Sequence, residues 1–369
     1  MRFSDGTETE AFPHSTRGEM TSDATAAQAP RDTATARARI VASFGRHYWI
    51  RSCGLRNCEA HTREAYTREA HTREAYTCDA HTRDGDERVA VTRGKRTDLC
   101  VGDEVEVRPL GADQAVIESL HERTTLLQRS DAWRTRLLAA NVEQAAVVIA
   151  GEPPFSEELL MRMLMAIETT GIAPAIVANK CDRASAREAI APRIEVYRAL
   201  GYPVFELSAL VDVDGARAAL APWLAGATTL LLGESGMGKS TLVNALVPDA
   251  QARTRAISQA LGTGRHTTTF SRLFELPADI APDARIVDSP GFQNYGLNHL
   301  SSSQRMHAMR DFAALIGRCR FHNCAHGDEP GCAIRVAAQQ GGIDALRYRL
   351  YGKIEQDERA EPRPTAPAT

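Results

Sequence analysis

The chain has 369 residues, of which 43% are hydrophobic and 25% are charged, and its formal net charge is −3. These values are ordinary for a globular protein with two or three domains, and they exclude nucleic-acid binding through an overall positive charge. No apolar run reaches the roughly 18 residues of a membrane helix, and the polar N-terminus lacks the apolar core of a secretion signal. We therefore expect a cytoplasmic protein without membrane contact, whose cysteines are free thiols or metal ligands.

The N-terminal part combines a polar tail with a small β domain. Residues 1–35 are rich in Thr, Ala and acidic side chains, with almost no large apolar ones, which predicts a disordered tail. Residues 36–130 contain five short β-rich runs separated by glycines, which suit an OB-like barrel that binds RNA, although periodicity alone also allows another small barrel. The expected strands are Arg39–Ser43, His47–Ser52, Arg88–Thr92, Asp103–Arg108 and Gln114–Leu120.

A tandem pentapeptide interrupts this β domain over residues 59–83. Its copies run from Glu59-Ala-His-Thr-Arg63 to Asp79-Ala-His-Thr-Arg83. A period of five matches neither a strand nor a helix, so the repeat cannot keep one face buried, and an expanded surface loop is the simplest interpretation. Its regularly spaced histidines and tyrosines leave metal binding or RNA stacking open as alternatives.

Between residues 131 and 298 strands and helices alternate, which predicts a doubly wound α/β sheet. The expected strands are Ala145–Ala150, Ala175–Ala178, Val204–Leu207, Thr228–Leu232 and Arg285–Val287. The expected helices are Glu157–Glu168, Ala184–Leu200 and Lys239–Leu246.

A phosphate-binding loop lies between one such strand and the helix that follows it. Gly233–Ser240 fits the pattern G-x-x-x-x-G-K-[ST] in full. Glycines let backbone N–H groups cradle phosphates, Lys239 would reach the β- and γ-phosphates, and the Ser240 hydroxyl would ligate Mg²⁺. The predicted phosphate-binding residues are Gly233, Glu234, Ser235, Gly236, Met237, Gly238, Lys239, Ser240 and Thr241.

A base-reading motif, Asn179-Lys180-Cys181-Asp182, follows the strand Ala175–Ala178. An Asp at this position accepts two hydrogen bonds from the N1–H and N2–H₂ edge of guanine, and adenine offers no matching pair of donors. The motif therefore favours GTP over ATP. Ser208-Ala209 resembles the SA element whose backbone supports the O6 atom of the base. The predicted base-binding residues are Asn179, Lys180, Asp182, Ser208 and Ala209.

Two segments are expected to sense the γ-phosphate. Gly264–Thr269 lies where switch I belongs, so Thr267 and Thr268 are predicted to contact the nucleotide, although the segment also suits a polar surface turn. Asp288 and Gly291 form a DxxG motif, in which Asp288 would hold Mg²⁺ through water and the Gly291 N–H would bond the γ-phosphate. The predicted Mg²⁺ ligands are Ser240, Thr267 and Asp288.

The order of these motifs is permuted, because the base-reading motif precedes the phosphate loop and DxxG comes last. Ras-like GTPases place a water-orienting Gln just after DxxG, where this chain has Phe292. Intrinsic hydrolysis should therefore be slow unless another group orients the water. His266 is the predicted catalytic residue for this role, and its alternative is a solvated loop histidine.

A cysteine- and histidine-rich cluster follows DxxG and predicts a helical zinc-binding module over residues 299–354. Its four ligands fit one closed structural Zn²⁺ site rather than an open catalytic one, with unliganded thiols as the alternative. The predicted zinc ligands are Cys319, Cys324, His326 and Cys332. The other cysteines are irregularly spaced, so we interpret them as incidental, with a second metal site as the alternative. A flexible tail is expected over residues 355–369.

The combination of an OB-like domain, a permuted GTPase and this cluster resembles the ribosome small-subunit-dependent GTPase A family. The resemblance covers roughly residues 38–352, and Arg318–His326 and Glu329–Cys332 are especially similar to the family's zinc segment. It implies a bacterial ribosome-biogenesis GTPase that binds the small (30S) subunit and 16S rRNA late in maturation, and whose hydrolysis the subunit stimulates. It also implies a switch I histidine that acts in hydrolysis, which is His266 here. The tail and the pentapeptide depart from the family pattern.

The runner-up interpretation is a GTP-locked RNA-binding checkpoint module with negligible turnover. Phe292, in place of the water-orienting Gln, supports this alternative. A zinc-bearing nucleotidase acting on small molecules lacks any second pocket signature. We expect a monomer, with other assembly factors as further partners. The basic residues considered for phosphate contact are Arg93, Lys95, Arg96, Arg123, Arg129, Arg134, Arg136, Arg318, Arg320, Arg335, Arg347, Arg349 and Lys353.

Overall fold

The computed structural model describes residues 35–44, 47–52, 87–94, 96, 98–111, 113–131, 134–248, 250 and 270–360. The expected tail before residue 35, the pentapeptide repeat and the predicted switch I residues His266, Thr267 and Thr268 lie outside the described residues. Within the described ranges, no helix combines the length and the apolar character needed to cross a bilayer.

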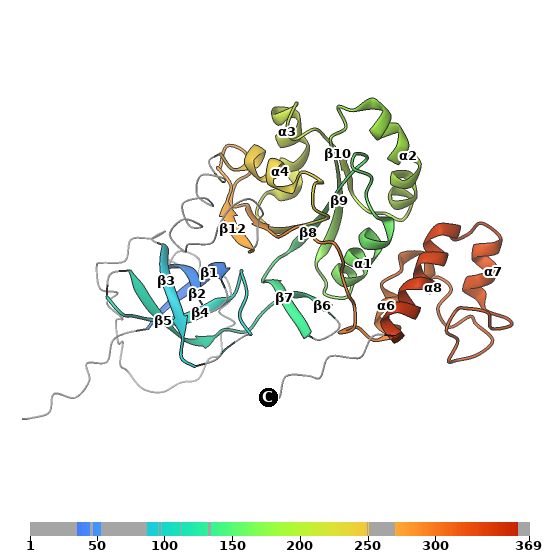
Figure 1. Cartoon of the computed structure of the whole chain (residues 1–369), viewed down its shortest axis with the longest axis horizontal. Coiled ribbons are helices and arrows are strands. Elements are labelled where there is room, and N and C mark those ends of the chain that lie inside the picture. Colours follow the sequence, from blue (N-terminus) through green and yellow to red (C-terminus); the bar gives the residue numbers. More distant parts are fainter. Residues whose placement is uncertain are drawn as a thin grey trace, which may run out of the picture. The chain divides into compact units, whose positions relative to one another are not determined.

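Five strands close into a barrel near the N-terminus (blue to cyan in Figure 1). They follow the order β1-β2-β3-β5-β4, and β4 returns to pair with β1. Inward-facing Ile40, Tyr48, Val105 and Ile117 fill its core, as the alternation of apolar residues requires. The five-stranded barrel is confirmed. The strands are β1 (Ala36–Phe44), β2 (His47–Ser52), β3 (Glu87–Thr92), β4 (Glu104–Pro109) and β5 (Gln114–Leu120).

A separate hairpin that the sequence did not predict follows the barrel. It pairs β6 (Leu126–Asp131) with β7 (Arg134–Ala140) as a two-stranded sheet. Leu127 is fully buried, while the β7 end at Arg134 is exposed. The polar residues after Leu127 do not alternate with apolar ones, so the sequence does not indicate a strand there. The hairpin is stabilised by the residues that pack against it.

The α/β sheet has the order β10-β9-β8-β11-β13-β12, and all its strands are parallel except β12. At the β12 edge, one residue pair, Ala42 with Arg272, joins it to β1 of the barrel. The doubly wound fold is confirmed, and the predicted strands lie within two residues of the observed ones. The strands are β8 (Gln144–Ala150), β9 (Ala173–Asn179), β10 (Val204–Glu206), β11 (Thr228–Leu232), β12 (Arg272–Glu275) and β13 (Arg285–Asp288).

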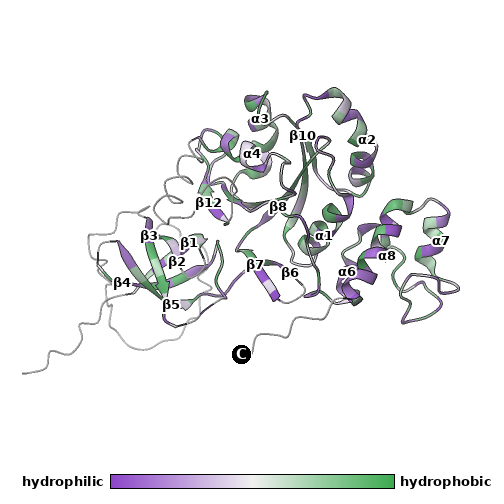
Figure 2. Ribbon diagram, viewed as in Figure 1, coloured by the Kyte–Doolittle hydropathy of each residue, from purple (hydrophilic) through white to green (hydrophobic). Residues whose placement is uncertain are grey.

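Helices cover both faces of this sheet, and its central strands are strongly hydrophobic (Figure 2). Val147 of β8 packs into the cluster that contains α1 and α2, whereas its neighbour Val148 packs into the cluster of α3 and α4. This alternation is what a strand buried on both faces needs. The helices are α1 (Glu157–Glu168), α2 (Ala184–Ala199), α3 (Val213–Leu224) and α4 (Lys239–Leu246). Neither α3 nor β12 was predicted.

The C-terminal module is helical, and its core is continuous with the α1–α2 side of the sheet through Phe312, Ile334 and Tyr351. The expected tail from residue 355 is wrong over its first six residues, because α8 continues to Ala360. Glu355 is buried in this helix, where it forms an ion pair with Arg305. The elements are α6 (Ser302–His307), η3 (Arg310–Phe312), α7 (Ala333–Gln339) and α8 (Ala345–Ala360).

Two of the basic residues considered for RNA contact pair with buried carboxylates. Arg347, 2% exposed, donates to Asp311 at 2.8 Å, and its guanidinium lies 5.1 Å from the ring centre of Tyr197 on α2. Arg123 donates to the buried Asp103 of the barrel at 2.7 Å. Arg347 is too buried to meet a phosphate, so the expectation was wrong for that residue, whereas phosphate contact by the partly exposed Arg123 stays a prediction.

We predict that Arg347→Met lowers the free energy of unfolding by about 3–5 kcal/mol, because it leaves the Asp311 carboxylate buried without its partner. Arg198→Met, which removes the solvent-accessible pairs of Arg198 with Glu195 and Glu206, should cost about 1 kcal/mol or less. Urea unfolding of both variants measures the difference, and equal midpoints would show that the buried pair does not stabilise the module.

Candidate functional site

The predicted nucleotide motifs meet at one edge of the α/β sheet. The base-reading motif follows β9, the SA element follows β10, the phosphate loop follows β11, and DxxG begins at the end of β13. These four strands are parallel, so their carboxyl ends lie at the same edge. The chain winds from β8 to β9 and β10, then returns to β11 on the other side of β8. The phosphate loop therefore occupies the topological switch point, where open α/β sheets bind ligands.

Glycines shape the phosphate loop. Gly236 and Gly238 have φ of 86° and 93°, a backbone region that other residues rarely adopt. A Cβ on Gly238 would lie 2.3 Å from Asn179 Nδ2, and one on Gly233 would lie 2.3 Å from the Val148 carbonyl oxygen. Helix α4 begins directly after the loop at Lys239, so its first N–H groups point to where phosphates would lie.

The Lys239 side chain is folded along this loop. It is buried, and Nζ donates to the carbonyl oxygens of Gly233 at 2.8 Å and Glu234 at 2.7 Å. Burial lowers its pKa to about 8, and the nearby Asp288 and Glu234 carboxylates oppose that shift. The ammonium is therefore held at the loop where a triphosphate would offer it anionic oxygens.

Asp288 lies at the end of β13 with an unsatisfied carboxylate. Burial raises its pKa to about 6, against the opposing effect of the Lys239 ammonium. Its Oδ1 has no hydrogen-bond partner in the part of the chain that the structure describes. A buried oxygen of this kind is a ligand for a hard divalent cation, so the site fits Mg²⁺. The predicted ligand Ser240 is exposed beside the buried Lys239.

Asn179 joins three of the nucleotide loops. It is 3% exposed, and its Nδ2 donates to the Met237 carbonyl oxygen of the phosphate loop at 3.1 Å. Its Oδ1 accepts from the Ala209 N–H of the SA element at 3.0 Å. Lys180, with φ of 64°, adds a second link, because its Nζ donates to the Gly236 carbonyl oxygen at 2.7 Å.

The predicted guanine reader Asp182 is exposed at the end of this loop. Ser208 holds Asp182 through two hydrogen bonds. Its hydroxyl donates to Asp182 Oδ1 at 2.7 Å and accepts from the Asp182 N–H at 2.7 Å. The carboxylate is thus oriented by the SA element, while its other oxygen stays available to a base.

The DxxG backbone lies against the phosphate loop, but the side chain that follows it does not face a nucleotide. A Cβ on Gly291 would lie 2.7 Å from Ser235 Cα, and the Phe292 N–H donates to the Gly233 carbonyl oxygen at 3.1 Å. The Phe292 ring is buried against Tyr295 at 5.6 Å, with the Arg129 guanidinium 5.5 Å from its centre. This position therefore supplies no group that could orient a water molecule.

The four predicted zinc ligands come together in the C-terminal module. Their ligand atoms lie within 4.8 Å of one another. His326 Nδ1 is 3.5 Å from Cys319 Sγ and 3.8 Å from Cys332 Sγ, so Nδ1 is the ring atom that faces the thiols. Three sulfurs and one imidazole fit a tetrahedral metal site, and the cluster could hold one metal ion. The Tyr348 hydroxyl donates to the His326 carbonyl oxygen at 2.8 Å and supports the loop.

Several supporting residues escaped the sequence analysis. Ser156 donates its backbone N–H to the carboxylate of the predicted Glu234 at 2.5 Å, and Ser289 donates to the Leu231 carbonyl oxygen at 2.5 Å. His326 Nε2 lies 2.8 Å from Met306 Sδ. Each contact joins residues far apart in the chain, so no local pattern announces it. Of the other cysteines, Cys100 is buried in the barrel, and Cys53, Cys58 and Cys78 lie outside the described residues.

Comparison with known proteins agrees with this geometry. A family model described as RsgA GTPase matches residues 120–298. The small ribosomal subunit biogenesis GTPase RsgA of Paraburkholderia phytofirmans is 50% identical over 263 residues, which cover 71% of this chain and 83% of that protein. The protein of the same name from Ralstonia pickettii is 44% identical over 271 residues, or 73% of this chain and 86% of that protein.

Two solved structures share the fold. YjeQ from Thermotoga maritima matches with a TM-score of 0.61 and 25% identity, over 89% of this chain and 100% of that chain. YloQ, described as a circularly permuted GTPase, matches with a TM-score of 0.58 and 22% identity, over 92% of this chain and 100% of that chain. The permuted order of the motifs is thus a property of the fold. The chain belongs to the RsgA family and is a circularly permuted GTPase of small ribosomal subunit biogenesis.

Proposed function

We propose that this protein binds the 30S subunit and its 16S rRNA late in subunit maturation, and that the subunit switches on its hydrolysis of GTP to GDP and phosphate. The observation that carries the proposal is the buried ring of Phe292 beside the assembled phosphate loop, base-reading motif and DxxG. Since that position cannot orient water, turnover waits for a group brought into place by the subunit. The same observation supports the alternative of a GTP-locked RNA-binding checkpoint with negligible turnover.

The bound nucleotide would be GTP with Mg²⁺. Asp182 would accept from the guanine edge, and the phosphate loop and Lys239 would hold the phosphates. Ser240 and Asp288 would hold the metal ion, together with Thr267 from the segment outside the described residues. When bound, Mg²⁺ neutralises charge on the β- and γ-phosphate oxygens. Thr267 is chosen as the switch I ligand from the sequence motif, which also contains Thr268.

His266 is proposed as the catalytic residue that orients and deprotonates the attacking water. Its support is its place between the phosphate loop and DxxG, together with the exclusion of Phe292 from that role. The metal of the C-terminal module is proposed to be one structural Zn²⁺, because four protein ligands leave no open position for substrate.

We predict that His266→Ala lowers the subunit-stimulated single-turnover rate by roughly 100-fold or more, the contribution of a general base. Binding of a non-hydrolysable GTP analogue should be unchanged. The exposed His307, which bonds to Ser303 on α6, gives a matched control in His307→Ala. Rates are measured with and without purified 30S particles. Absence of stimulation in the unmodified protein would favour the GTP-locked module, and a normal rate in His266→Ala would refute the catalytic assignment.

We predict about one zinc ion per chain by elemental analysis, because the described part of the chain holds one four-ligand cluster. Cys324→Ser should lose that ion and lower the thermal midpoint, since a structural metal contributes directly to folding free energy. Cys181→Ser, at a cysteine outside the cluster, should keep it. Unchanged zinc content in Cys324→Ser would contradict the ligand assignment.

A further inference from the structure

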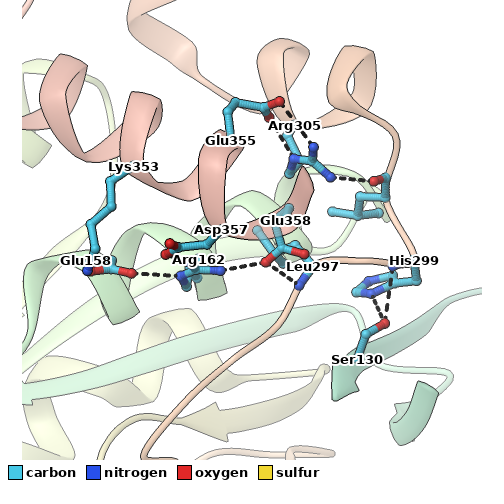
Figure 3. A network of polar contacts seen from close by, with 11 residues as sticks. Ser130, Glu158, Arg162, Leu297, His299, Arg305, Lys353, Glu355, Asp357 and Glu358 are labelled. Carbon is cyan, nitrogen blue, oxygen red and sulfur yellow. Dashed lines mark hydrogen bonds and ion pairs between the residues drawn. The ribbon is translucent and has the colours of Figure 1, made fainter. Parts of the chain in front are cut away.

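The segment that follows DxxG is held along its length. At its start, the Phe292 N–H donates to the phosphate loop at Gly233. In its middle, the Tyr295 hydroxyl donates to the Gln128 carbonyl oxygen at 3.1 Å. At its end, the Leu297 N–H donates to Glu358 Oε1 at 2.9 Å (Figure 3). Because the segment is short and hydrogen-bonded at both ends, a shift at one end would strain the hydrogen bond at the other.

Glu358 connects that segment to two helices. It lies on α8 with its side chain 2% exposed, and the same Oε1 accepts from Arg162 of α1 at 2.5 Å (Figure 3). Arg162 also bonds to Asp357 at 2.7 Å and to Glu158 at 3.1 Å. One carboxylate oxygen thus bonds both to α1 and to the backbone that leads from the γ-phosphate sensor.

Stability alone does not account for a charge at this place. A buried ion pair replaced by apolar side chains of similar volume is often neutral or stabilising. Apolar side chains also pack here, since Leu297 and Ile354 are fully buried in the same core. Burial raises the pKa of Glu358, and the Leu297 N–H and the Arg162 guanidinium oppose that effect. What an apolar side chain could not do is accept the Leu297 N–H.

We propose that Glu358 is a positioning residue for GTP hydrolysis, which fixes the segment after DxxG through the Leu297 N–H and so couples γ-phosphate sensing to the C-terminal helix α8. This inference rests on the proposed subunit-stimulated hydrolysis. Because Gly291 packs against Ser235 of the phosphate loop, the carboxylate on α8 helps to set how closely the Gly291 N–H approaches a γ-phosphate. Contacts made on α8 would then act on the switch.

The test compares Glu358→Leu with Asp357→Asn in the full-length protein. Asp357, the residue before Glu358, bonds to the same arginine but makes no hydrogen bond to the described residues of the segment. Glu358→Leu should bind GDP as the unmodified protein does, yet bind a non-hydrolysable GTP analogue more weakly and lose about tenfold in 30S-stimulated rate, the effect of one charged hydrogen bond. Glu358→Gln keeps a hydrogen-bond acceptor, so it should recover most of the GTP-analogue affinity and most of the 30S-stimulated rate. Asp357→Asn should match the unmodified protein.

A second variant separates positioning from folding. Arg162→Met with Glu358→Met removes both buried charges but also leaves the Leu297 N–H unpaired, so it should melt no lower than Glu358→Leu while showing the same loss of rate. The inference is overturned if Glu358→Leu matches Asp357→Asn, or if it weakens GDP and the GTP analogue equally. If the unmodified protein shows no stimulation by 30S, the proposed function fails instead, and the ratio of GTP-analogue to GDP affinity still tests Glu358.

Discussion

The nucleotide site depends on the two hydrogen bonds of the Asn179 side chain. A buried amide must satisfy both its donor and its acceptor, and this one does so with the Met237 carbonyl oxygen and the Ala209 N–H. Those bonds join the loops after β9, β10 and β11, and they do not depend on the order in which these strands occur in the sequence. The permutation leaves this convergence intact, because parallel strands bring their carboxyl ends to one edge regardless of connectivity.

The permutation changes what is attached to the phosphate sensor. In this chain DxxG is followed by a short segment that pairs with β6 through one antiparallel bridge, Gly296 with Ser130, and then enters the C-terminal module. The module is not loosely appended. Arg193 and Arg310 join it to α1, α2 and neighbouring backbone through ion pairs and hydrogen bonds. A change at the γ-phosphate would therefore act on this segment and its anchors, including Glu358, rather than on a free hinge.

Sequence was a good guide wherever a local pattern carries the chemistry. Glycine spacing at Gly233–Ser240 and ligand spacing at Cys319–Cys332 are fixed by the geometry of phosphate and metal binding, so both could be located without a structure. Sequence-based prediction failed where the structure of a segment depends on a residue far along the chain. The β6–β7 hairpin has no clear period, Arg347 resembled a surface cation, and the charged run after Glu355 resembled a tail. Each is explained by a tertiary partner that pattern cannot reveal.

If the 30S subunit switches on hydrolysis, binding of the subunit and binding of GTP should be coupled, so the bound nucleotide should change the affinity for the subunit. Co-sedimentation of the full-length protein with purified 30S, 50S and 70S particles, in GDP and in a non-hydrolysable GTP analogue, tests it most directly. We predict recovery with 30S particles, greater in the GTP analogue than in GDP, and little with 50S particles. Equal recovery in the two nucleotides, or none with 30S particles, would contradict the claim.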